Sequence, residues 1–180
     1  QSLERRIGKT ATDESNGPSG VIGVDGGDAK LNDARMTNVL LRFGGVETAI
    51  PAGAKILNAN ITLVTRTGSN DQSGNTFNVY RLTRPFTVTS SSAGANPDFG
   101  TDGIEGDVDM ILGSFHGMST PETATVVSAD VTRAVQSWVD GTAANLGVGI
   151  RADQGTDGWV YNSNTAPQAV RPKLEDRKSV

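Results

Sequence analysis

Few residues in this 180-residue sequence are suited to catalysis. There is one histidine, His116, and there is no cysteine, which excludes a thiolate nucleophile or a thiolate metal site. Ser114 and Ser119 lie near His116, but neither sits in a nucleophile motif of the G-x-S-x-G type. A carboxylate pair for glycoside hydrolysis is the alternative that sequence spacing leaves open. We expect a protein without catalytic activity, with His116 in a solvated loop.

Acidic residues gather in two stretches whose oxygens suit calcium, an ion that accepts irregular loops of carboxylate and carbonyl ligands. They are Asp25, Asp28 and Asp33 in the first stretch, and Asp102, Glu105, Asp107 and Asp109 in the second. Neither stretch has the spacing of an EF-hand. We expect the second stretch to be the better candidate for a structural calcium site. The alternative is a set of acidic turns in which each Asp caps its own backbone.

Arginines at strand positions are the best candidates for ligand binding. A guanidinium binds a carboxylate through two parallel hydrogen bonds, so arginines on a strand face suit an acidic polysaccharide. The candidates are Arg42, Arg81, Arg84 and Arg171, and Tyr80 is the best candidate among the few aromatic residues for an exposed stacking position. The alternative is that these arginines point outward and pair with neighbouring acids.

The net charge of −4 is unevenly distributed. From Asp98 to Asp157 there are ten acidic residues and only two basic ones, Arg133 and Arg151. A nucleic-acid-binding protein is expected to have a dominant positive field, so we do not expect that function. No apolar run approaches the roughly 20 residues that a membrane-spanning helix needs.

Short alternating apolar runs separated by turn residues recur along the chain and predict strands. The expected strands are residues 21–24, 39–43, 57–64, 77–82, 108–112, 123–129, 146–150, 158–162 and 170–174. In the strand at 57–64 we expect Leu57, Ala59, Ile61 and Leu63 to face the core. Strands at this spacing, with 22 glycines in the chain, favour an all-β, two-sheet, jelly-roll-like sandwich.

A single convincing helix is expected after Asp130, whose carboxylate can accept the first free backbone N–H groups. The helix is expected to end at Gly141, because glycine adopts the left-handed cap conformation easily. Its apolar side has helical spacing and comprises Val131, Ala134, Val135 and Trp138. We therefore expect Trp138 to lie in the core and not in a ligand site.

The first 20 residues are polar and end in a turn-like Gly-Pro-Ser-Gly, so we expect an extended arm at 1–20 and a sandwich domain at 21–180. The arm lacks proline up to its final turn and contains two large apolar residues, Leu3 and Ile7. Since edge strands of a sandwich readily accept an added strand, the arm can dock on its own domain or on a neighbouring molecule. The alternative is a flexible linker.

Several ordered segments resemble a known family of extracellular domains. They are VLLRF at 39–43, IPAGAKILNANITLV at 50–64, VYRLTRPF at 79–86, DVTRAVQSWVDG at 130–141, GWVYNS at 158–163 and RPKL at 171–174. The set is similar to the DNRLRE-type or disaggregatase-related domains, which overlap a family of alginate-binding-like carbohydrate-binding modules. The chain departs from that pattern at Phe86, where the family typically has Trp, and in its charged C-terminal residues.

The resemblance implies a jelly-roll-like sandwich that is non-catalytic and secreted or located at the cell surface. Two functions fit these expectations. The first is a structural subunit that self-associates into a fibre, surface layer or matrix, with the N-terminal arm as connector. The second is a carbohydrate-binding module that recognises an acidic polysaccharide. We favour the first, because the sequence offers no obvious aromatic platform.

Overall fold

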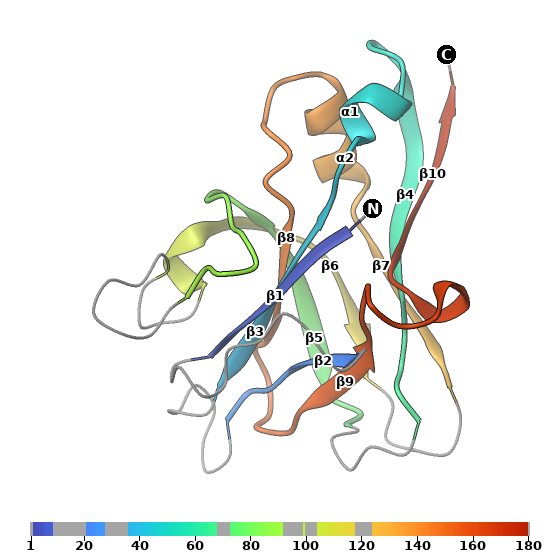
Figure 1. Cartoon of the computed structure of the whole chain (residues 1–180). Coiled ribbons are helices and arrows are strands. Elements are labelled where there is room, and N and C mark those ends of the chain that lie inside the picture. The colour runs from blue at the N-terminus through green and yellow to red at the C-terminus, as the bar shows by residue number, and fades with distance from the viewer. Residues whose placement is uncertain are drawn as a thin grey trace.

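The computed structural model describes residues 2–8, 21–27, 36–67, 73–91, 99, 104–117 and 124–179. Strands dominate these ranges, which confirms the predicted all-β sandwich (Figure 1). The strands are β1 (Ser2–Gly8), β2 (Val21–Val24), β3 (Thr37–Phe43), β4 (Lys55–Val64), β5 (Thr76–Leu82), β6 (Val108–His116), β7 (Val126–Asp130), β8 (Val148–Ala152), β9 (Trp159–Asn162) and β10 (Lys173–Ser179). The helical elements are α1 (Val46–Ala49), α2 (Thr132–Val139) and the 3₁₀ turns η2 (Glu105–Asp107) and η3 (Gln168–Val170).

The described strands form two antiparallel sheets and a two-stranded ribbon. The large sheet has the order β1-β3-β8-β5-β6, the small sheet has the order β10-β4-β7, and β2 pairs with β9. The ribbon connects the two sheets at one end. Thr65, just after β4, bridges to Tyr161 of β9, and Asp25, just after β2, bridges to Thr37 of β3.

A row of aromatic side chains fills the middle of the sandwich. Phe77 of β5 stacks on Phe115 of β6 with ring centroids 5.7 Å apart, and Phe115 lies 4.9 Å from Trp159 of β9. The Trp159 ring then stacks on Tyr161 at 5.3 Å. All four side chains are buried, so the row ties the ribbon to the large sheet by dispersion and apolar burial.

A second apolar cluster covers the outer face of the large sheet. It is formed by Leu40, Leu82, Phe86, Phe99 and Ile104, with Leu3, Val108 and Leu146 packed against it. The segment that follows β5 contributes Phe86, Phe99 and Ile104. The large sheet is therefore covered on both faces, which explains why Val39, Leu40 and Leu41 of β3 are all fully buried.

Helix α2 agrees closely with the sequence prediction. The carboxylate of Asp130 accepts the backbone N–H of Thr132 at 2.7 Å, and Gly141 follows the helix with a positive φ of 68°. The predicted apolar residues Val131, Ala134, Val135 and Trp138 are all buried in the main core. Neither α2 nor any other helix in the described ranges is long and apolar enough to cross a membrane.

Strand β4 differs from its predicted pattern at Leu57. Ala59, Ile61 and Leu63 face the core as expected, but Leu57 is 48% exposed and Ile56 is buried instead. The cause is a β-bulge: Arg177 of β10 pairs with Asn58, and the next residue, Lys178, pairs with Ile56. One extra residue on β4 reverses the faces of the side chains before it.

The side of the sandwich at β6 and β7 is closed by direct backbone contact between the sheets. A side chain on Gly113 of β6 would place its Cβ 2.7 Å from the carbonyl oxygen of Asp130 at the end of β7. This distance is shorter than real contacts of a Cβ, so glycine is needed here for the close approach of the two backbones.

We expect Gly113→Ala to destabilise the fold by about 1–3 kcal/mol, because the seam between β6 and β7 must open to admit a methyl group. The matched control is Gly74→Ala, since a Cβ at Gly74 meets nothing within 4 Å. That control should be neutral or more stable by up to about 1 kcal/mol, through the reduced entropy of the unfolded chain. Urea unfolding of both variants measures the difference, and equal effects would contradict the close packing.

Candidate assembly site

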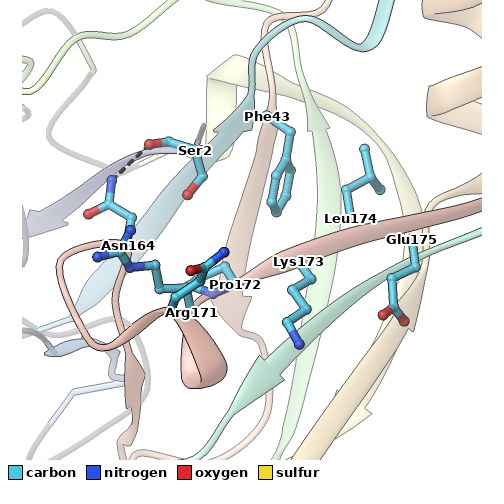
Figure 2. Close-up of a pocket in the computed structure, with 9 residues that line it drawn as sticks. Ser2, Phe43, Asn164, Arg171, Pro172, Lys173, Leu174 and Glu175 are labelled. Carbon is cyan, nitrogen blue, oxygen red and sulfur yellow. Dashed lines mark hydrogen bonds between the residues drawn. The ribbon is translucent and has the colours of Figure 1, made fainter. Parts of the chain in front are cut away.

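The side of the sandwich opposite that seam is open, and a groove lies there between β1 and β10. In the described part of the chain these two strands are the outer strands of the large and small sheets. The groove has a volume of about 510 Å³ and is lined by Ser2, Phe43, Asn164, Gln168, Arg171, Pro172, Lys173, Leu174 and Glu175. Figure 2 shows Phe43 and Leu174 between the two strands, with Ser2 and Asn164 on one side and Glu175 on the other.

The groove continues beneath α1 into a second hollow of about 200 Å³. The two hollows share Phe43 and Leu174, and the second is also lined by Gly44, Gly45, Val46, Ala49, Ile50 and Asp176. We call the two hollows together the β1–β10 groove. Its lining combines apolar side chains, among them Phe43, Val46 and Leu174, with the charged Arg171, Lys173, Glu175 and Asp176.

Strand β1 is the part of the predicted N-terminal arm that the structure describes. It pairs with β3 in antiparallel register from Ser2 opposite Phe43 to Gly8 opposite Thr37. Leu3, predicted as an assembly residue, packs on the outer cluster around Leu40 and not in the groove. Ile7, the other predicted assembly residue, is placed opposite Asn38 by its backbone, and its side chain lies outside what the structure describes.

The side chain of Glu4 anchors β1 in the interior. It is 1% exposed, and its carboxylate accepts the backbone N–H of Asn164 at 2.8 Å and a long bond of 3.5 Å from the Tyr161 hydroxyl. Two further bonds hold the strand: the Asn164 side chain donates to the Ser2 carbonyl at 2.8 Å, and Arg5 donates to the Ser90 carbonyl at 2.6 Å. A terminal strand is thus fixed by side chains as well as by its ladder.

Burial dominates the electrostatics of this contact. It raises the pKa of the Glu4 carboxyl from 4.5 to about 7, against the opposing effect of the hydrogen bonds from Asn164 and Tyr161. Burial also raises the pKa of Tyr161 well above 10, and the neighbouring Glu4 raises it further. The buried Glu4 carboxyl therefore binds its proton more tightly than an exposed one, and Tyr161 keeps its proton.

The predicted sugar-binding residues on β5 and after it are paired with acids. The Tyr80 hydroxyl donates to Asp153 at 2.6 Å, and burial, followed by that bond, raises the pKa of Tyr80 to about 12. Arg81 forms an ion pair with Asp109. Both groups lie on the large sheet, far along the strand order from the β1–β10 groove.

The other predicted arginines are dispersed. Arg84 pairs with Asp107 at 2.9 Å and lies over the ring of Phe99. Arg42 is on β3, opposite Leu3. Of the five predicted residues, Arg171 alone lines the groove, where its Nε donates to the Ala166 carbonyl at 2.5 Å. The structure therefore does not bring the predicted set together on one face.

The acids predicted to bind calcium face different arginines. Glu105 lies 3.9 Å from Arg151, while Asp107 and Asp109 pair with Arg84 and Arg81 as described above. Asp102 is outside the described residues. Within the described ranges no three acidic, histidine or cysteine side chains converge as a metal site. Calcium binding stays a prediction.

The first acidic stretch and His116 show local bonding. The Asp25 carboxylate accepts the backbone N–H of Gly27 at 2.8 Å, the self-capping turn considered above, while Asp28 and Asp33 lie outside the described residues. His116, at the end of β6, is 3.1 Å from the Thr76 hydroxyl of β5. That neighbour is a strand threonine and neither of the serines considered as nucleophiles.

Sequence reasoning missed the three residues that hold β1, namely Glu4, Tyr161 and Asn164. The only large apolar residues of the arm are Leu3 and Ile7, so polarity alone gives no sign that Glu4 is buried. In the structure Leu3 packs on the outer cluster, and the opposite face of β1, with Glu4, enters the interior beside Tyr161. No local signal links residues separated by 157 positions.

Compared with models of protein families and with curated proteins, the sequence matches none of them. The resemblance to DNRLRE-type domains therefore stays a prediction, and the arguments below rest on the geometry.

We expect Asn164→Ala to weaken the attachment of β1 by about 1 kcal/mol, because the Ser2 carbonyl loses its side-chain donor while the backbone bond to Glu4 is kept. Hydrogen exchange of the β1 amides should report this loss. The matched control is Asn58→Ala on the exposed side of β4, which should change stability by less than about 0.5 kcal/mol. Unchanged protection of β1 in Asn164→Ala would contradict the anchoring role.

Proposed function

We propose that this protein is a non-catalytic, secreted structural subunit that self-associates by exchanging strand β1 between neighbouring molecules. The observation that carries the proposal is the docking of β1: an N-terminal strand at the side of the large sheet, anchored by a side chain inserted into the body of the domain. The same contacts form equally well when β1 comes from a second molecule. The products are a fibre, a surface layer or a matrix.

Strand β1 is well placed for exchange. Residues 9–20 separate it from β2, and a connection of that length can span about 40 Å when extended. Release of β1 leaves β3 in the sheet, because β3 also pairs with β8 through Val39, Leu40 and Leu41. A strand with these properties can swap at low cost, since it makes the same interactions in its own domain and in a neighbouring one.

Release of β1 would leave the edge of β3 unpaired until another strand binds there. Strand β3 would then present an open ladder edge, with the fully buried Leu40 and Leu41 beside it. The charged strand β10, in contrast, is protected by Lys173, Glu175 and Arg177 against unspecific pairing. The edge of β3 is therefore the site that favours association, and β1 is the segment that fits it.

Recognition of an acidic polysaccharide is the second candidate function. It is favoured by the two cationic side chains, Arg171 and Lys173, that line the β1–β10 groove together with the amides of Asn164 and Gln168. A groove of this volume can hold a few sugar residues, and its cations suit carboxylates. Glu175 in the same lining opposes such a ligand.

Strand exchange can be tested with cysteine pairs, because the native chain has none. Leu3 and Arg42 are directly opposite each other in the β1–β3 pair, which suits a disulfide. Mixing Leu3→Cys with Arg42→Cys protein should yield a disulfide-linked heterodimer under oxidising conditions. The double variant should form the bond within one chain and, once locked, should no longer associate.

The matched control replaces Arg42→Cys by Thr62→Cys, on the outer face of the small sheet, where β1 does not reach. Light scattering of the wild-type protein should show dimers and larger species that increase with concentration. Strand exchange is excluded when the Leu3→Cys and Arg42→Cys mixture gives no more heterodimer than the control mixture, or when the locked variant associates like the wild type.

Binding of alginate can be tested by affinity electrophoresis. If the groove holds an acidic polysaccharide, Lys173→Gln should weaken binding about threefold, the effect expected of one exposed cation, and salt should weaken it further. The matched control is Lys55→Gln, at the other end of the same sheet. Equal retardation of both variants and the wild type would contradict a carbohydrate site in this groove.

A further inference from the structure

The acidic side chain of Glu4 on β1 is surrounded by hydrogen-bond donors and apolar groups. The carboxylate of Glu4 meets the Tyr161 hydroxyl of β9 and the backbone N–H of Asn164, and β3 opposite it contributes Leu41. The ribbon strand β2 contributes the apolar Ile22 and Val24 to the same core. None of these described neighbours carries a positive charge that would neutralise the carboxylate.

The charged and titratable groups near Glu4 are few. Tyr161 is the titratable group on β9, and burial keeps it neutral, as described above. On β1 itself, Arg5 is on the opposite face, bonded to Ser90, and Arg6 is on the same face as Glu4, two residues along the strand. Among the described residues no cation forms an ion pair with Glu4. Its ionised form thus has two hydrogen bonds but, in the described part of the chain, no ion pair, and burial of such a charge is costly.

We propose that Glu4 is a proton-controlled latch for strand β1: with a neutral carboxyl the strand stays docked, and loss of the proton releases it for exchange between molecules. This inference rests on the proposed strand exchange and names what regulates it. The same contact defines which strand is accepted, because the pocket formed by Tyr161 and Asn164 needs a hydrogen-bond acceptor at the position that Glu4 takes in the incoming strand.

The register of β1 depends on the same side chain. A shift by one residue would turn Glu4 to the outer face, and a shift by two would place Ser2 or Arg6 at the pocket. Serine is too short to reach both donors, and arginine has no acceptor group. The structure therefore selects a second copy of this β1 over an unrelated strand.

The direction of the pH effect follows from proton binding. The pKa of Glu4 is about 7 in the docked strand and near its ordinary 4.5 when the strand is free, because burial is lost. Between these values the docked strand holds a proton that the free strand does not. Docking therefore weakens as pH rises, by up to about tenfold per pH unit and about 300-fold over the full range, and the effect levels off above pH 7.

The test measures docking and association separately between pH 5 and pH 8. Docking is measured as the hydrogen-exchange protection factor of the β1 amides, corrected for the intrinsic exchange rate at each pH. Association is measured by light scattering on the same samples. For the wild type we expect protection of β1 to fall about 100-fold and association to become faster across this range.

Glu4→Gln keeps an acceptor in the pocket and cannot ionise, so its β1 protection should be independent of pH. The matched control is Glu175→Gln, an exposed acid on β10, which should keep the wild-type profile. Tyr161→Phe is a second probe, in case Glu4→Gln fails to fold. It removes a donor that favours the ionised carboxylate, so the profile should move to higher pH.

The outcomes separate the latch from the strand exchange. A Glu4→Gln profile that matches the wild type, or a Tyr161→Phe profile that does not move, would overturn the latch while leaving strand exchange intact. Wild-type protection that falls with pH and becomes flat in Glu4→Gln supports the latch. If that result comes with no association at any pH, the latch holds within one molecule and strand exchange is refuted.

Discussion

The aromatic contacts from Phe77 through Phe115 and Trp159 to Tyr161 are the interaction on which the rest of the structure depends. They fix the β2–β9 ribbon against the large sheet, and the Trp159 indole also donates to Thr65 at 3.3 Å. The last ring in the row is Tyr161, whose hydroxyl reaches Glu4. The core therefore positions the anchor of β1, and packing in the middle of the domain is coupled to its N-terminal strand.

The buried Glu4 makes the folded domain less stable than an apolar residue at the same position would. Three neighbouring residues of β3 are fully buried, so a leucine at position 4 would be consistent with local packing. Positions where the residue type does not match its buried surroundings are often functional. Here the exception lies on an outer strand of the large sheet, whose neighbour β3 is also paired with β8. If β1 is exchanged as proposed, the combination gives the domain a local equilibrium that is separate from global unfolding.

Local patterns predicted the parts of the fold whose signals are contained in a few neighbouring residues. Helix α2 was predicted from Asp130 to Gly141, and the burial of Trp138 with it. The bulge at Leu57 was not predicted, because it depends on the register of β10, more than a hundred residues later. The charged β10 was predicted to end at Leu174, although Lys173–Ser179 forms a strand by pairing with β4. Of the candidate site, the arm was noted, but the acid that anchors it was not, since its partners are distant in sequence.

The side-by-side placement of β1 and β3 has a consequence for the geometry of any assembly. Each molecule offers one strand and one acceptor, and these are different surfaces. Two molecules that exchange β1 reciprocally close into a two-fold dimer, whereas donation in one direction only is heterologous and leaves one acceptor and one strand open. Growth then produces a polar filament or a ring. The two ends of a filament are chemically distinct, one with a vacant β3 and the other with an unplaced β1, and elongation at each has its own rate.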